Sequence, residues 1–262
     1  MLVWFIINKD LKIQTQKYKK WVTAVIFVIV VALITLELTF GIGRSAFAIK
    51  VIGQGEVMTA IAHRVRRSCL SNNEVQEINN VSKVQQDILV GAKERTSHSV
   101  LYISKYYSDN EGKPPDHEGV CTDLFWRALE PAQIDIQELI YQDMKKNEQE
   151  YPLSLWGMDA PDRGIDFRRV PNIEVYLKRY AKSLTLEVNE CDFDNLKEWQ
   201  PGDIVIFKLD RKGPSDHIAI VSDKRESNGV PYLIHNYGVG EVERAGLTRF
   251  GEIVGHYRIS GI

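Results

Sequence analysis

The sequence predicts an α+β fold in which helices come first and an antiparallel sheet comes last. Apolar residues at helical spacing dominate residues 84–184, whereas short strand-like runs separated by turns fill residues 203–259. Strands and helices do not alternate, which argues against a doubly wound parallel sheet. The chain of 262 residues is 44% hydrophobic and 26% charged, so it holds enough apolar material for a core. We therefore expect N-terminal helices packed on a C-terminal antiparallel sheet.

Four helices are expected, over residues 84–92, 120–130, 134–146 and 172–184. In the second, Val120, Leu124 and Ala128 lie on one face and Pro131 ends the run. A strand-like run over residues 100–107 precedes that helix. The helices should bury these apolar faces against the sheet.

The last third of the chain is a series of short strands, over residues 203–209, 217–223, 231–236 and 253–259. Before the last helix, residues 151–172 are dense in Pro, Gly, Asp and Arg, which predicts a long ordered loop. Long loops in compact domains are often functional. This loop is therefore a candidate part of a site.

Charge and motifs exclude several function classes. The formal net charge of -2, from 33 basic and 35 acidic residues, leaves no global positive field for a polyanion, so nucleic acid is not an expected partner. The sequence contains neither a dinucleotide-binding nor a P-loop fingerprint. Its three cysteines are far apart and form no zinc-ribbon spacing. We expect no cofactor and no metal.

The N-terminus predicts export across a membrane. Residues 1–20 are rich in lysine and should be cytoplasmic, because positive flanks stay inside. Residues 21–43 form an apolar run interrupted only by Glu37, long enough for a single-pass anchor. The alternative is a cleaved signal ending near Ala46–Ala48, which would leave the protein secreted or periplasmic. In both cases the working domain is extracytoplasmic.

Two further regions follow. Residues 44–83 are polar, first basic and then rich in Asn and Glu, and are interpreted as a stalk or linker that includes Cys69. Residues 84–262 carry the patterns of the folded domain. Because the number of cysteines is odd, at least one thiol should be free or pair with another chain.

Cys121 is the candidate nucleophile. It follows Gly119 and Val120 at the start of the expected helix over residues 120–130. Unpaired N–H groups and the helix dipole at such a position favour the thiolate and offer donors for an oxyanion. The alternative is a small buried hydrophobic residue, the commonest fate of a free cysteine.

Two histidines are candidates for the base and its orienting partner. His217 opens one strand and His235 lies in the next; a hairpin between these strands brings both rings to one face. Imidazole suits proton transfer near neutral pH, and a second polar group can hold the ring in place. Asn236 points to the opposite face from His235, and is the alternative orienting residue.

Several motifs in the same order resemble the bacterial domain-of-unknown-function family 1287, from about residue 85 to the C-terminus. They are GVCTDLFWRAL, PDRGIDFRRVPN, WQPGDIVIFKL, DHIAIVSD and LIHNYGVG. That family in turn resembles, more distantly, the papain-like cell-wall hydrolases of the NlpC and CHAP type. The resemblance implies a papain-like fold with Cys121 as nucleophile, His217 as base and His235 as orienting residue.

The resemblance also suggests supporting residues and shows one departure. Tyr106 or Tyr107 lies where those hydrolases carry a tyrosine near the active site, and Asp123 follows the nucleophile closely. The family's usual histidine in the long loop is Phe167 here. Any family role of that imidazole is therefore absent from this chain.

The sequence leaves three hypotheses. The leading one is a cysteine peptidase or amidase that cleaves an amide bond in a peptidoglycan or other peptide. The second is an inactive wall-binding or scaffolding module. Its recognition surface, or alternatively an ion-paired network within the loop, would consist of Arg163, Asp166, Arg168 and Arg169. The third is a zinc site built from Cys121, His217 and His235.

Overall fold

The structure is a computed structural model that describes residues 68–260. The expected cytoplasmic segment, residues 1–20, and the expected anchor or signal, residues 21–43, lie outside the described residues, as does most of the expected stalk. No helix within residues 68–260 has the length and apolar character needed to cross a membrane.

One antiparallel sheet forms the centre of the described domain. Its strand order is β3-β8-β4-β5-β6-β7, and every neighbouring pair is antiparallel. The strands are β3 (Lys182–Ser183), β4 (Ile204–Lys208), β5 (His217–Arg225), β6 (Pro231–Asn236), β7 (Glu241–Arg244) and β8 (Glu252–Arg258). The predicted α+β class with an antiparallel sheet is confirmed.

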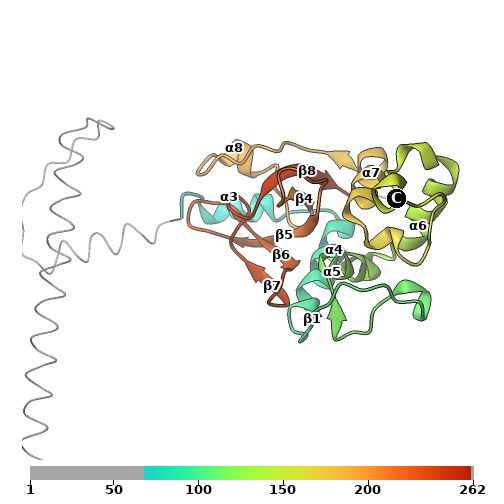
Figure 1. The fold of residues 1–262 in the computed structure, drawn as a ribbon. Helices are drawn as coiled ribbons and strands as arrows, with labels where there is room; N and C mark the ends of the chain where they lie inside the picture. The colour runs from blue at the N-terminus through green and yellow to red at the C-terminus, as the bar shows by residue number, and fades with distance from the viewer. Residues whose placement is uncertain (1–67, 261–262) are drawn as a thin grey trace, which may run out of the picture. The chain divides into compact units, whose positions relative to one another are not determined.

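The helices precede most of this sheet along the chain, as the sequence predicts. They are α3 (Asn72–Ile78), α4 (Lys83–Arg95), α5 (Cys121–Leu129), α6 (Ile136–Lys146), α7 (Val170–Tyr180) and α8 (Phe193–Leu196). Short 3-10 helices connect them: η1 (Asn110–Gly112), η2 (Glu130–Ala132), η3 (Glu148–Glu150), η4 (Leu153–Trp156) and η5 (Asp166–Arg168). Figure 1 shows α6 and α7 at one end of the domain and α3 and α8 at the other.

Strand alternation divides the interior into two apolar cores, one on each face of the sheet. Ile218 and Ile220 of β5 belong to the first core, which they share with α4, α5, α6 and α7. Ala219 and Val221 of the same strand belong to the second core, together with Leu70, α3 and α8. Successive side chains of a strand point to opposite faces, so this one strand contributes to both cores.

Residues 68–83 pack against the sheet and do not stand apart from it. Ser71 caps α3 through a capping box with Glu74, and Ile78 at the end of this helix is buried in the second core. The folded region therefore begins before residue 84, within residues 44–83, which we interpreted as a stalk because of their polar composition.

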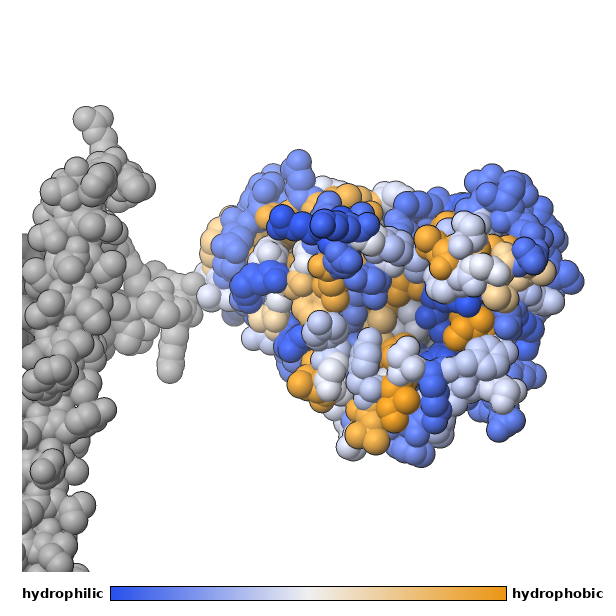
Figure 2. Space-filling view, in the orientation of Figure 1, coloured by the Kyte–Doolittle hydropathy of each residue, from blue (hydrophilic) through white to orange (hydrophobic). Residues whose placement is uncertain are grey.

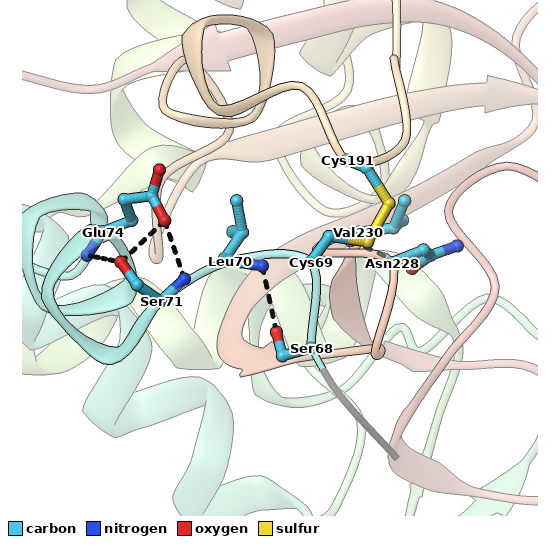
Figure 3. The surroundings of a disulfide bond; sticks show 8 residues. All are labelled: Ser68, Cys69, Leu70, Ser71, Glu74, Cys191, Asn228 and Val230. Carbon is cyan, nitrogen blue, oxygen red and sulfur yellow. Dashed lines mark hydrogen bonds between the residues drawn. A yellow bond between two sulfur atoms is a disulfide. The ribbon is translucent and has the colours of Figure 1, made fainter. Parts of the chain in front are cut away.

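A disulfide joins this early segment to the middle of the chain (Figure 3). Cys69 pairs with Cys191, which lies just before α8, and their Cα atoms are 5.2 Å apart. The backbone N–H groups of the two cysteines donate to Ser227 and Asn228 in the β5–β6 turn, at 2.8 and 2.9 Å. Cys121 is the free cysteine of the described residues.

We expect the disulfide to contribute strongly to stability, because it closes a loop with a sequence separation of 122 residues. Replacing both cysteines by serine should lower the free energy of unfolding by roughly 2–5 kcal/mol. Urea unfolding with and without reductant measures this. Reduced wild type should match the double variant, which should not respond to reductant; a wild type insensitive to full reduction would contradict the prediction.

Candidate active site

A short strand pair leads into the helix that begins with Cys121. β1 (Leu101–Tyr102) runs parallel to β2 (Glu118–Gly119), with Tyr102 opposite Gly119. Val120 is extended, and its N–H donates to the carboxylate of Asp123 at 2.8 Å. Because Asp123 is the third helical residue, its side chain can accept a hydrogen bond from a backbone N–H at the helix start that has no helical carbonyl partner. A Cβ on Gly119 would lie 2.9 Å from Asp123, so this approach requires glycine.

A buried ion pair fixes the helix start to the long loop. Arg168 donates through Nε and Nη2 to the two oxygens of Asp123, at 2.8 and 2.9 Å, and both side chains are buried. The hydroxyl of Thr122 donates to the carbonyl of Arg168 at 3.1 Å. Bidentate pairs of this kind hold both partners in one geometry. The loop and the first turn of α5 therefore form one rigid unit.

Cys121 lines a pocket of about 230 Å³. The other lining residues come from β1, the start of α5, the long loop and the segment before β5: Tyr102, Ser104, Val120, Thr122, Trp156, Arg168, Arg169, Val170, Pro171, Ser215 and Asp216. Cys121 itself is 4% exposed. The N–H groups of Cys121 and Thr122 belong to the first turn and have no helical carbonyl partner. These donors lie beside the sulfur.

Burial decides the charge of the thiol. It raises the pKa of Cys121 to about 12, although backbone N–H groups of Ile218, Thr122 and Cys121 itself act in the opposite direction. The lowered pKa expected from the helix start is therefore wrong for the ligand-free protein. Desolvation of the charged form outweighs the helix-terminal donors, so Cys121 is a neutral thiol at pH 7.

His217 and His235 form a buried pair on one face of the sheet. Nε2 of His217 lies 2.8 Å from Nδ1 of His235, which confirms the juxtaposition expected from the hairpin. The rings lie against Phe250, and Tyr237 lies edge-on to His217 with ring centroids 5.6 Å apart. Burial lowers the pKa of His217 to about 3 and that of His235 to about 4, and Arg244 acts in the same direction on both.

The Cys121 sulfur and the histidine pair lie on different faces of β5. Ile218 packs in the first core with α5, and its backbone N–H hydrogen-bonds the Cys121 sulfur. His217 shares the other face with Ala219. Among residues 68–260, the recorded hydrogen bond of the His217 ring is to His235, and none joins it to Cys121. The structure thus brings two of the three predicted residues into contact and places the third beside the same strand.

Asn236 faces the start of α5. Its Nδ2 donates to the carbonyl of Gly119 at 3.3 Å, and its Oδ1 is buried without a protein partner. The side chain therefore lies opposite to that of His235, as strand alternation predicts. It contacts the backbone two residues before Cys121, and its recorded hydrogen bond does not involve His217.

The tyrosine that lines the Cys121 pocket is neither of the two that the sequence suggested, although the ring centroid of Tyr107 lies 4.9 Å from the guanidinium of Arg168. The hydroxyl of Tyr106 donates to Asp162 at 3.4 Å and that of Tyr107 to Glu118 at 2.8 Å, and both line another pocket. Tyr102 lines the Cys121 pocket instead and lies edge-on to Tyr237, with ring centroids 6.4 Å apart. The parallel pairing of β1 with β2 places it there.

The charged loop residues are held by internal contacts, and Arg163 pairs with Glu111 and Glu138 at 2.8 and 3.0 Å. Besides the Arg168–Asp123 pair, Arg169 donates to Asp166 at 2.7 Å, and its guanidinium lies 4.2 Å from the centroid of Trp156. Asp166 is 1% exposed and does not line the pocket, whereas both arginines do. Phe167, at the position of the family's usual histidine, is buried against Trp126. The ion-paired network is therefore observed, and its arginines also border the pocket.

Residues 68–260 contain no cluster of three or more His, Cys, Asp or Glu side chains arranged to hold a metal ion. The zinc site considered from Cys121, His217 and His235 has no support in that part of the chain.

Sequence comparison gives two matches. Residues 89–259 match the family described as "Domain of unknown function (DUF1287)". The chain is also similar to "Uncharacterized protein YijF" of Escherichia coli strain K12, with 38% identity over 170 residues that cover 64% of this chain and 78% of that protein. Both Cys121 and the histidine pair lie inside the matched range.

The histidine pair should make stability depend on pH. Because the folded pKa values of His217 and His235 lie below the ordinary value of about 6.5, the unfolded chain binds protons first as pH falls. Stability is therefore complete above pH 6.5 and declines towards pH 3, by up to about 1.4 kcal/mol per pH unit for each histidine. Urea unfolding between pH 7 and 5 measures the slope.

The double variant His217→Gln, His235→Gln should have a shallower slope, whereas the exposed control His98→Gln should keep that of the wild type. If stability depended equally on pH in the wild type and the double variant, the conclusion that both imidazoles are buried in the neutral form would be contradicted.

Proposed function

The chain belongs to the DUF1287 family, and from that premise we propose that it is an extracytoplasmic cysteine hydrolase of papain-like fold that cleaves an amide bond in a cell-wall peptide. One observation carries the proposal. A free cysteine occupies the first position of a helix and lines a pocket, beside the strand whose first residue belongs to a buried histidine pair. Nucleophile, base and orienting group are the parts that such chemistry needs.

The reaction follows from these groups. Cys121 attacks the carbonyl carbon as its proton passes to His217, and the N–H groups of Cys121 and Thr122 stabilise the oxyanion. His217 then gives the proton to the leaving amine, the C–N bond breaks, and an acyl-thioester remains. Water, deprotonated by His217, hydrolyses the thioester and restores the thiol.

The proposal requires a local change on substrate binding. Thiol and imidazole are neutral at pH 7 and are not hydrogen-bonded to each other in the ligand-free protein. Because His217 and Cys121 lie on different faces of β5, His217, the first residue of this strand, must change its backbone position as well as its ring orientation when substrate enters. Catalytic hydrogen bonds often tighten only in the substrate complex.

The pocket has groups suited to a peptide. The hydroxyl of Ser215 lines it and is buried without a protein partner, so it is available to a polar group of the substrate. Arg169 also lines the pocket, with its guanidinium paired to Asp166. Leu101, Tyr102, Tyr237 and Val239 are exposed. Figure 2 shows an apolar area where β1 lies in Figure 1, and apolar parts of a peptide would bind there.

Location outside the cytoplasm is supported by the Cys69–Cys191 disulfide, because disulfides persist in oxidising compartments. It agrees with the export signal or anchor expected at residues 21–43. Membrane attachment through that segment is part of the proposal.

A second candidate is a non-catalytic wall-binding module on the same fold. The raised pKa of Cys121 and its lack of a hydrogen bond to His217 favour this function. Such a module would bind peptidoglycan with equal affinity before and after alkylation of Cys121 and would release no product. Product release therefore separates the two candidates.

We expect Cys121→Ser and His217→Ala to lower the rate of hydrolysis of peptidoglycan stem peptides by about 10³-fold or more. Each change removes either the nucleophile or the base, and the two groups act together in the proposed reaction. The assay follows new amino groups by mass spectrometry. His98→Ala, which removes an exposed histidine, is the matched control and should retain wild-type activity. Full activity in either site variant would refute the mechanism, and absence of turnover in the wild type would favour the binding module.

A further inference from the structure

A third side chain continues the histidine pair away from the pocket. Nε of Arg244, on β7, donates to Nε2 of His235 at 3.1 Å. Within residues 68–260, the side-chain hydrogen bond of Arg244 is to His235, and its guanidinium lies 5.6 Å from the ring centroid of Phe250. A hydrogen-bonded row therefore runs from Arg244 through His235 to His217.

The hydrogen-bonding chemistry of arginine determines where the protons lie on the two histidines. An arginine N–H can only donate, so Nε2 of His235 must be the unprotonated, accepting nitrogen. A neutral His235 then carries its proton on Nδ1 and donates it to Nε2 of His217. Since Nε2 of His217 accepts, a neutral His217 carries its proton on Nδ1. Burial of both rings favours these neutral forms.

We propose that Arg244 is a positioning residue that orders the protons of the His217–His235 pair, holding both on Nδ1. Nε2 of His217 is occupied by His235, so Nδ1 is the ring nitrogen left for any other partner. While Arg244 is hydrogen-bonded to His235, Nδ1 of His217 carries a proton, so it can donate a hydrogen bond but cannot accept a proton.

The consequence for Cys121 rests on the proposed function. To accept the thiol proton on Nδ1, His217 must first carry its own proton on Nε2, and His235 must do the same. That order points Nε2–H of His235 at Nε–H of Arg244, so two donors face each other. Ionisation of Cys121 by His217 therefore requires the Arg244–His235 hydrogen bond to break. Arg244 restrains the base until that bond is released.

Few other polar groups compete for this role. Tyr237 lies edge-on to His217, and Phe207 and Phe250 complete the surroundings of the rings. Glu243, the neighbour of Arg244 on β7, is engaged by Ser222 and Lys224 instead. Among residues 68–260, Arg244 is thus the charged side chain that is hydrogen-bonded to the pair.

Tautomers can be measured directly by NMR on the full chain labelled with ¹⁵N-histidine, using long-range ¹H–¹⁵N spectra at pH 7. His217→Gln and His235→Gln assign the two rings. In the wild type both rings should carry their proton on Nδ1. Arg244→Met should move at least one ring to the Nε2–H form, whereas Arg244→Lys should preserve the order, because an ammonium group also only donates.

The matched control is Arg249→Met, which removes an exposed arginine paired with Glu226 and should leave both tautomers unchanged. A wild-type His235 protonated on Nε2 would overturn the proposal. So would an Arg244→Met variant, folded by circular dichroism, in which both tautomers stay as in the wild type.

A second measurement tests the link to Cys121. Acylation of Cys121 by peptidoglycan stem peptides at pH 7.5, followed during the first turnover by mass spectrometry, should be about tenfold faster or more in Arg244→Met than in the wild type, since proton transfer no longer breaks a hydrogen bond to a charged group. An unchanged acylation rate with altered tautomers would leave the proton order standing and count against the proposed function. The two failures are therefore distinguishable.

Discussion

The carboxylate of Asp123 is the group on which the geometry around Cys121 depends. It accepts the N–H of Val120 at the helix start and both nitrogens of the Arg168 fork, and it is fully buried. Removing one partner of a buried pair leaves an uncompensated charge, so the arrangement has little tolerance for change. Through Asp123 the first turn of α5 is joined to the long loop, and residues of both line the pocket beside Cys121.

Burial also explains why the resting site is uncharged. Desolvation keeps the Cys121 thiol protonated and both imidazoles neutral, against the backbone donors at the helix start. A neutral resting state does not exclude catalysis, because the proton needs to move only when substrate is present. In the proposed mechanism, the histidine pair, ordered by Arg244, determines when His217 can accept that proton.

Periodicity was enough to predict the sheet and the meeting of His217 with His235, because strand alternation and a hairpin are local properties. The start of α5 at Cys121 followed from a Gly-containing loop before an apolar helical run. Tyr102 and Arg244 were not predicted. The position of Tyr102 depends on the parallel β1–β2 pairing, which leaves little signal in one sequence. Arg244 lies on β7, a short strand in a hairpin with β6 that the sequence pattern did not reveal. The raised thiol pKa depends on burial by segments remote in the chain.

The most direct test of the central claim is to trap the acyl-enzyme. The full chain is mixed with peptidoglycan stem peptides, quenched with acid during the first turnover, and digested for mass spectrometry. We predict a mass increase equal to the acyl part of the substrate on the peptide that contains Cys121. Cleavage of the same substrate by a Cys121→Ala variant, or turnover by the wild type through an adduct on another residue, would contradict the account.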